Sequence, residues 1–160
     1  MNKKITLLSL VIALMILTAC SQQFNIVAHE EIKFYDSEDV RGCGRYMDSS
    51  VLSVGTVVIN SQEDYQALLD QYQVLHKCEW GKEPPAIDFS QKTLLGQFTT
   101  GGGCSIEYNR IVKRFDEEKK IVYTVEVKEK GFCDMAGISM NWITIPKIPA
   151  GYGVEFKIKK

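Results

Sequence analysis

The feature that most constrains the fold is a pair of alternating segments around an acidic turn. Residues 105–112 and 120–128 place β-branched and aromatic residues at alternate positions, and residues 116–119 separate them. Such alternation is typical of half-buried strands. In an antiparallel hairpin the numbers of paired residues have a constant sum, which closure on this turn fixes at about 235 to 237. The pattern therefore predicts a long hairpin with one buried face.

The N-terminal end carries an export signal. Lys3 and Lys4 precede an uncharged apolar run over residues 5–17, which is shorter than the about 20 residues of a membrane span and typical of a signal peptide. The sequence LTAC at residues 17–20 resembles the lipobox of bacterial lipoproteins. The resemblance implies cleavage before Cys20, diacylglycerol on its sulfur, and acylation, for instance with palmitate, of the new amino group. The alternative is an ordinary signal peptide followed by a chance cysteine.

Two or three acyl chains anchor a protein stably in a membrane, where one chain gives only marginal binding. We therefore expect a lipid-anchored protein of the bacterial cell envelope. Ser21 lacks the charge of the known inner-membrane retention signal, so we expect the outer membrane if the cell is Gram-negative. Residues 1–19 are expected to be the signal peptide, 20–42 a lipidated N-terminus and tether, and 43–160 a single globular domain.

Four cysteines remain once Cys20 is set aside: Cys43, Cys78, Cys104 and Cys133. An even number in an exported protein predicts two disulfides. The hairpin register brings Cys104 opposite Gly131 or Cys133, and the apolar residues that share their parity lie on one face. We therefore expect a Cys104–Cys133 bridge, which leaves Cys43–Cys78 as the second pair. A bulge near Gly131 would shift this register.

Composition and spacing argue against most cofactor and nucleic-acid chemistry. The 160 residues are 45% hydrophobic and 24% charged with a net charge of −1, which is typical of a globular protein and not of a basic nucleic-acid binder. The cysteine spacings are too wide for a zinc site, and nothing marks His29 or His76 as the partner of a catalytic cysteine. A phosphate-binding loop would need a helix after residues 101–103, where a strand is expected instead. We expect no metal, cofactor, nucleic acid or catalytic residue.

The remaining segments complete an α+β pattern. A β-branched strand at residues 56–59 precedes a helix that starts at Ser61 and repeats its apolar residues at helical spacing. Further strands are expected at 93–98, 142–146 and 154–158, and Gly101, Gly102 and Gly103 are expected to form a flexible turn or bulge. The sum is one antiparallel sheet of about six strands, which can curl into a sandwich or barrel, with one main helix.

The order of these pieces resembles the PrcB C-terminal-like domain of exported bacterial proteins and lipoproteins. The resembling residues are 57–65, 85–90, 94–96, the glycine turn and 142–146. The family takes its name from a subunit that assembles with and stabilises an exported protease, so the resemblance implies a partner-binding role and carries over no catalytic residue. One departure is that Cys104 follows the glycines, where the family often has an aromatic residue.

These observations favour a lipid-anchored, non-enzymatic module that binds an envelope protein or stabilises a protease. We expect the glycine turn at residues 101–103 to contact that partner, because backbone without side chains can approach another surface closely. One alternative is a hydrolase of cell-envelope polymers that uses two carboxylates, chosen from Asp64, Asp88, Asp116, Glu126 and Asp134. Another is an inhibitor of exported proteases in which the glycine turn inserts into the enzyme.

The lipidation hypothesis predicts that the mature protein partitions into detergent. Cys20→Ser removes the acceptor sulfur, so we expect this variant to be released from membranes or to keep its signal peptide. Mass spectrometry of the N-terminal peptide checks the prediction directly. An unacylated N-terminus at a residue other than Cys20 would refute it.

Overall fold

The computed structural model describes residues 24–32, 55–76 and 85–160. These residues form one helix and eight strands, and no helix among them is long and apolar enough to cross a membrane. The elements are β1 (Asn25–Ile26), β2 (Glu30–Ile32), β3 (Thr56–Ile59), α2 (Gln62–His76), β4 (Lys92–Gly102), β5 (Ser105–Phe115), β6 (Lys120–Lys130), β7 (Ala136–Pro146) and β8 (Gly153–Lys159). The predicted positions of Cys20, Cys43 and Cys78 lie outside the described residues.

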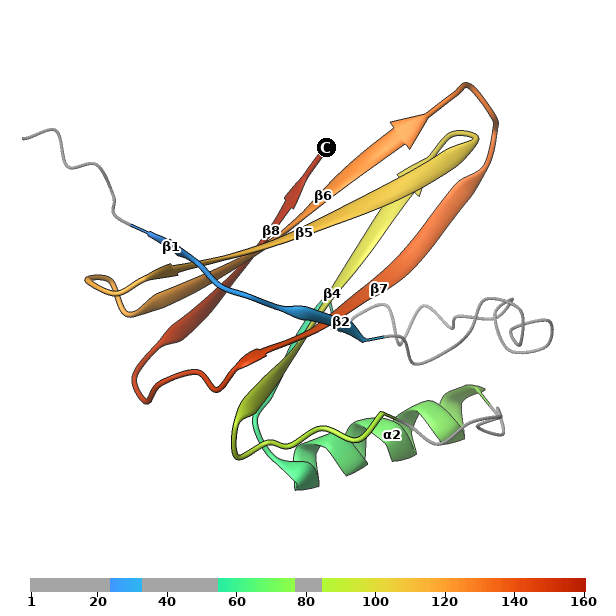
Figure 1. Cartoon of the computed structure of the whole chain (residues 1–160). Helices are drawn as coiled ribbons and strands as arrows, with labels where there is room; N and C mark the ends of the chain where they lie inside the picture. The colour runs from blue at the N-terminus through green and yellow to red at the C-terminus, as the bar shows by residue number, and fades with distance from the viewer. Residues whose placement is uncertain (1–23, 33–54, 77–84) are drawn as a thin grey trace, which may run out of the picture.

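The strands form two four-stranded sheets that pack face to face. Sheet A has the order β1-β5-β6-β8 and sheet B the order β2-β7-β4-β3. Helix α2 covers the face of sheet B that points away from sheet A (Figure 1). The α+β class is confirmed, and the expected sheet of about six strands that can curl into a sandwich or barrel is only roughly matched: the described residues form two sheets of four strands, with no closed barrel. Strands β4 and β7 need cover on both faces, and one flat sheet with one helix would leave one of these faces in water.

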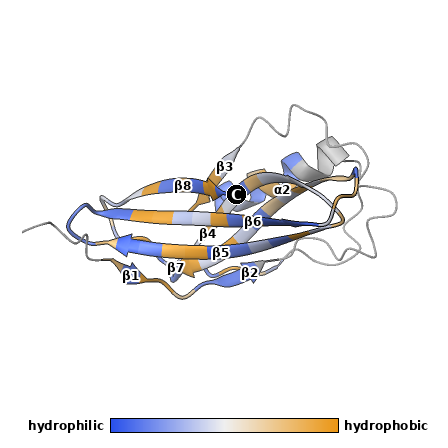
Figure 2. Cartoon of the chain, turned by 90° about the horizontal axis from the view of Figure 1, so that it is seen from above, coloured by the Kyte–Doolittle hydropathy of each residue, from blue (hydrophilic) through white to orange (hydrophobic). Residues whose placement is uncertain are grey.

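The hairpin of β5 and β6 has the register expected from its turn. Ser105 pairs with Lys130 and Phe115 with Lys120, so the paired numbers sum to a value inside the predicted range. The buried side chains of both strands point towards sheet B, where they form the core between the sheets with Leu95, Ile143 and Ile145. Figure 2 shows the hydrophilic turn of this hairpin and both hydrophobic and hydrophilic stretches along its strands.

Helix α2 begins where the sequence predicts. The backbone N–H of Asp64 donates to the Ser61 hydroxyl at 3.1 Å, which makes Ser61 the N-cap. Tyr65 and Leu69 are buried against Leu94 and Trp142 of sheet B, in a second core with the other members Ile59, Ile87 and Phe89. The Tyr65 hydroxyl donates to the Pro85 carbonyl at 2.9 Å, and burial raises the pKa of Tyr65 to about 12. This helical face has a packing role.

The expected tether over residues 20–42 is wrong for residues 25–32. Asn25 and Ile26 pair with Arg114 and Lys113 of β5, and β2 pairs with residues 142–144 of β7. Each short strand closes one edge of a sheet, and so satisfies backbone groups that would otherwise face solvent. Two- and three-residue strands show no readable alternation, which explains why the sequence pattern missed them.

Strand β7 is longer than expected because its first half faces a polar layer between the sheets. The buried Asn141 side chain donates to the Gln97 carbonyl at 3.2 Å and to the Thr99 hydroxyl at 2.8 Å. The Tyr123 hydroxyl from sheet A donates to the Asn141 carbonyl at 3.1 Å, and burial raises the pKa of Tyr123. Because polar residues occupy the inward positions of this half, the hydrophobic pattern of the sequence does not indicate a strand there.

A glycine pair lets the two sheets approach closely beside this layer. Gly101 of β4 pairs with Gly137 of β7, and Ile106 of sheet A packs onto both. A Cβ atom at Gly137 would overlap the Cδ1 atom of Ile106. The expected glycine turn is therefore corrected: Gly101 and Gly102 belong to β4, and only Gly103, with a φ of 99°, lies in the turn.

Gly137→Ala should destabilise the protein by about 1–3 kcal/mol, the usual cost of overpacking a core. Ile106→Val removes the clashing methyl group, so the double variant should recover part of the loss. Gly153→Ala is the control, since nothing lies within 4 Å of a Cβ there. Urea unfolding of the three variants measures the effect. Equal stability of Gly137→Ala and wild type would contradict the close approach.

Candidate partner-binding tip

Two chain connections meet at the end of the molecule opposite β1 (Figure 1). The turn after β4 carries the chain from sheet B to sheet A, and the connection after β6 carries it back to β7. We name residues 102–104 and 131–135 together the disulfide tip. The amide of Gly103 donates to the Met135 carbonyl at 3.2 Å, and the amide of Cys104 donates to the Lys130 carbonyl at 2.7 Å. Each connection is therefore hydrogen-bonded to the other.

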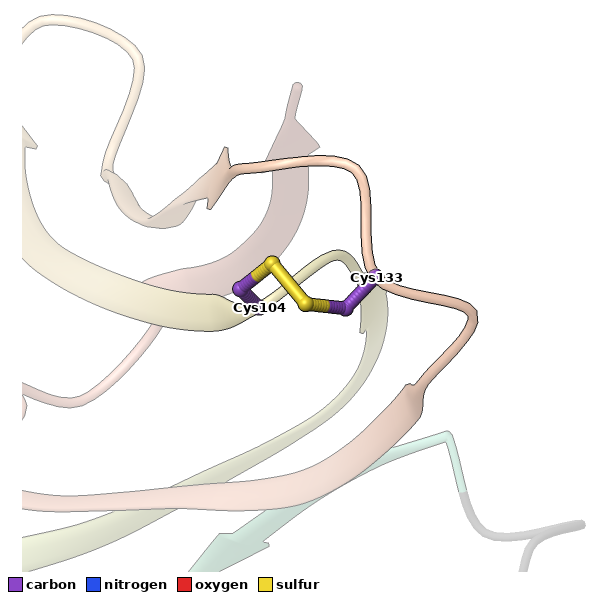
Figure 3. Close-up of a disulfide and its surroundings, with 2 residues drawn as sticks. All are labelled: Cys104 and Cys133. Atoms are coloured by element: carbon purple, nitrogen blue, oxygen red, sulfur yellow. A yellow bond between two sulfur atoms is a disulfide. The ribbon is translucent and has the colours of Figure 1, made fainter.

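A disulfide joins the two connections. Cys104 and Cys133 are bonded, with their Cα atoms 4.7 Å apart, as the hairpin register predicts (Figure 3). The bridge closes a segment that contains the whole β5–β6 hairpin. The expected second pair, Cys43–Cys78, lies outside the described residues. The covalent link fixes the tip to both sheets at once.

Two glycines with positive φ allow the bridge to form. Gly131 has a φ of 77°, and a Cβ atom there would lie 2.6 Å from the Cys104 sulfur. A Cβ atom at Gly103 would lie 2.8 Å from the Lys130 carbonyl oxygen. Gly102 differs, because a Cβ atom there meets only the Met135 carbonyl at an ordinary 3.5 Å. Gly103 and Gly131 are thus required by the backbone, whereas Gly102 can be substituted.

The tip presents apolar side chains to solvent. Phe132 is fully exposed, and Met135 and Ile138 are 59% and 47% exposed. Phe132 and Met135 lie on the β6–β7 connection and Ile138 lies on β7. Phe132 lines an open depression of about 390 Å³. Its lining residues are Gly102, Gly103, Glu129, Gly131, Phe132, Cys133 and Asp134. Exposed aromatic rings and exposed thioethers are characteristic of surfaces that bind proteins.

Carboxylates border the depression. The Gly102 amide donates to the Glu129 carboxylate at 3.0 Å. Asp134, on the connection between β6 and β7, also lines the depression. The Lys130 ammonium forms an ion pair with Glu107, which lowers the pKa of that carboxyl. Glu129 also forms an ion pair with Lys160 at 3.7 Å, so the tip combines an apolar centre with a border that carries both charge signs. Such a surface suits a partner with an apolar pocket and a polar rim.

The other candidate catalytic carboxylates lie apart on separate elements, and each has a local hydrogen-bond or ion-pair partner. Asp64 belongs to the helix cap, and Asp88 accepts from the Ser90 amide and hydroxyl, which lowers its pKa. Asp116 lies in the β5–β6 turn, and Glu126 on the outer face of sheet A pairs with Lys159 at 2.9 Å. His29 is exposed between β1 and β2. Among the described residues no group of three or more His, Cys, Asp or Glu side chains could hold a metal.

Phe132 is the site residue that sequence reasoning missed. The signal was present, because an aromatic residue between Gly131 and Cys133 falls just beyond the end of a predicted strand. A hydrophobic residue in a short connection is usually assigned to the core. The disulfide and the positive φ at Gly131 turn this connection outwards instead.

Removing the bridge with Cys104→Ala and Cys133→Ala should lower stability by about 3–4 kcal/mol, as chain entropy gives for a loop of this length. The sequence separation that sets this loop is 29 residues. Calorimetry should show a melting temperature lower by roughly 10 °C or more. Under reducing conditions the wild type and the variant should melt at similar temperatures, which is the control for the loss of two sulfurs. An unchanged melting temperature in the Cys104–Cys133 variant would contradict a structural role for the bridge.

No family model, curated protein or solved structure matches this chain. The resemblance to the PrcB C-terminal-like domain therefore remains a hypothesis that rests on the sequence motifs given above.

Proposed function

We propose that this protein is a non-enzymatic module, lipid-anchored through Cys20, that binds an envelope protein through the disulfide tip. The observation that carries the proposal is the full exposure of Phe132 on a connection closed by a disulfide. A soluble protein gains nothing in folding stability from such a ring. Its exposure is useful when a second surface covers it.

The covalent closure of the tip favours binding energetically. A surface held in its bound conformation before association loses less entropy on binding than a loose loop. Phe132 supplies a ring with few rotatable bonds, and Met135 supplies a side chain that adapts to an irregular pocket. Buried aromatic anchors of this kind commonly carry most of the energy of an interface.

The position of Phe132 also bears on the PrcB resemblance. The family often has an aromatic residue after its glycine pair, and Cys104 stands there in this chain. Phe132 lies on the neighbouring connection, beside the same turn and joined to it through the adjacent Cys133. An aromatic ring is thus available next to the glycines from a different part of the chain. This supports an exported protease as one class of partner.

A second candidate function is inhibition of an exported protease. The specific observation in its favour is the same exposed ring beside a rigid turn, which fits insertion into a substrate pocket. A stabilising subunit and an inhibitor differ in their effect on the partner: the first lengthens its lifetime, and the second blocks its turnover.

The hydrolase alternative has less support. A glycosidase acid keeps its proton through a raised pKa, whereas hydrogen bonds from Ser90, Tyr152 and Lys159 lower the pKa values of Asp88, Asp116 and Glu126. Each of these carboxylates also has a local structural partner. Turnover of peptidoglycan or of a peptide by the purified protein would nevertheless overturn the non-enzymatic proposal.

The test places a photoreactive phenylalanine analogue at position 132 in the membrane-bound protein. We expect a specific cross-link to a protein partner that mass spectrometry identifies. The same analogue at position 158 is the matched control, because Ile158 is also exposed but lies on β8.

Phe132→Ser should then weaken binding of the identified partner by about 30-fold or more, as removal of an interface anchor does. Ile158→Ser should leave the affinity unchanged. If the partner is a protease, its activity and its half-life with each variant separate inhibition from stabilisation. Equal affinity of Phe132→Ser and wild type would remove the tip from the interface.

A further inference from the structure

A second exposed apolar patch lies at the opposite end of sheet A from the disulfide tip. Strand β1 pairs with the end of β5, and this register places Phe24 and Ile26 on the outer face beside Phe115 and Lys113. Phe24 is 41% exposed and Ile26 is 67% exposed. We name Phe24, Ile26, Lys113, Phe115 and Lys120 the hairpin-end patch.

Lysine and aromatic side chains alternate within the patch. The rings of Phe24 and Phe115 lie 5.6 Å apart. The Lys113 ammonium lies 4.0 Å from the centre of the Phe24 ring, and the Lys120 ammonium lies 5.2 Å from that of Phe115. Aromatic rings next to ammonium groups are characteristic of protein surfaces in the headgroup layer of a membrane.

Strand β1 is held firmly against the hairpin turn. The Asp116 carboxylate accepts a hydrogen bond from the Tyr152 hydroxyl at 2.7 Å and from the Asn25 amide at 3.2 Å. The Arg114 guanidinium lies 2.8 Å from the same carboxylate. These three partners come from the loop before β8, from β1 and from β5. The patch is therefore part of the rigid body of the domain.

The chain outside the structure limits how far this patch can lie from a lipid on Cys20. Four Cα steps separate Cys20 from Phe24, and at 3.8 Å each they span at most about 15 Å. The disulfide tip lies at the other end of β5, whose 11 residues extend over about 35 Å. The two ends therefore differ strongly in their distance from the anchor.

We propose that the hairpin-end patch rests on the phospholipid headgroups of the membrane that holds the Cys20 acyl chains, so that the disulfide tip points away from that membrane. The inference rests on acylation of Cys20, which is part of the proposed function. Phe24 and Phe115 lie among the headgroups, and the Lys113 ammonium faces a lipid phosphate. Lys120 also pairs with Glu118 and Glu155, so Lys113 is the main cation for the lipid.

The test uses the full chain, processed in a bacterial host and reconstituted in vesicles of phosphatidylethanolamine and phosphatidylglycerol. Mass spectrometry first establishes the acylated N-terminus. Hydroxyl-radical footprinting then measures the oxidation of Phe24 and Phe115 at one end and of Phe132 and Met135 at the other. The reference is the Cys20→Ser chain without vesicles. We expect severalfold protection of Phe24 and Phe115, and unchanged oxidation of Phe132 and Met135.

Lys113→Gln should lower the ratio of docked to undocked protein by about fivefold, as expected for loss of one cation beside an anionic surface. Oxidation of Phe24 should rise accordingly. Lys128→Gln is the matched control, since Lys128 is exposed on the same outer face but near the disulfide tip. Circular dichroism checks that both variants keep the fold.

Three results would overturn the inference, and they are distinguishable. Equal oxidation of Phe24 in the acylated protein and in the reference rejects the docked patch, while partner binding by the tip remains intact. Protection of Phe132 and Met135 by vesicles reverses the orientation and also contradicts the tip as a protein-binding surface. An unacylated N-terminus rejects both the anchor and the orientation, but not binding by the tip.

Discussion

The burial of strands β4 and β7 on both faces is the constraint on which the rest of the structure depends. Leu94 points into the core beneath α2, and its neighbour Leu95 points into the core between the sheets. Both are fully buried. Sheet A must therefore lie over one face and the helix over the other. The chain can satisfy this arrangement only by crossing between the sheets, and two of its crossings meet at the disulfide tip.

The local elements could be predicted from the sequence because each had a strong local signal. The alternation around the 116–119 turn predicted the register of β5 and β6, and that register predicted the Cys104–Cys133 bridge. Ser61 marked the start of α2. The division into two sheets had no such local signal, because it depends on which strands pair with one another across long sequence separations. Strand β8, for example, pairs in parallel with β6 after the chain has passed through sheet B.

The candidate site was predicted only in part, for a physical reason. The sequence predicts one turn at residues 101–103, yet Gly101 is needed where Ile106 packs and Gly103 where φ is positive. Hydrophobicity alone assigns Phe132 to a core. Its exposure follows from its two neighbours in the chain. Gly131 before it has a positive φ, and Cys133 after it is held by the disulfide. The proposed orientation on the membrane depends on β1, a strand too short to show an alternating pattern in the sequence.

Backbone relaxation by NMR measures whether the disulfide tip is a rigid platform for Phe132. For a rigid tip we expect order parameters of about 0.8 or more for the amides of residues 131–135 in the oxidised mature protein, as in the adjoining strands. Values below about 0.6 would show a loose loop. That result would contradict the claim that Phe132 is held in place for binding.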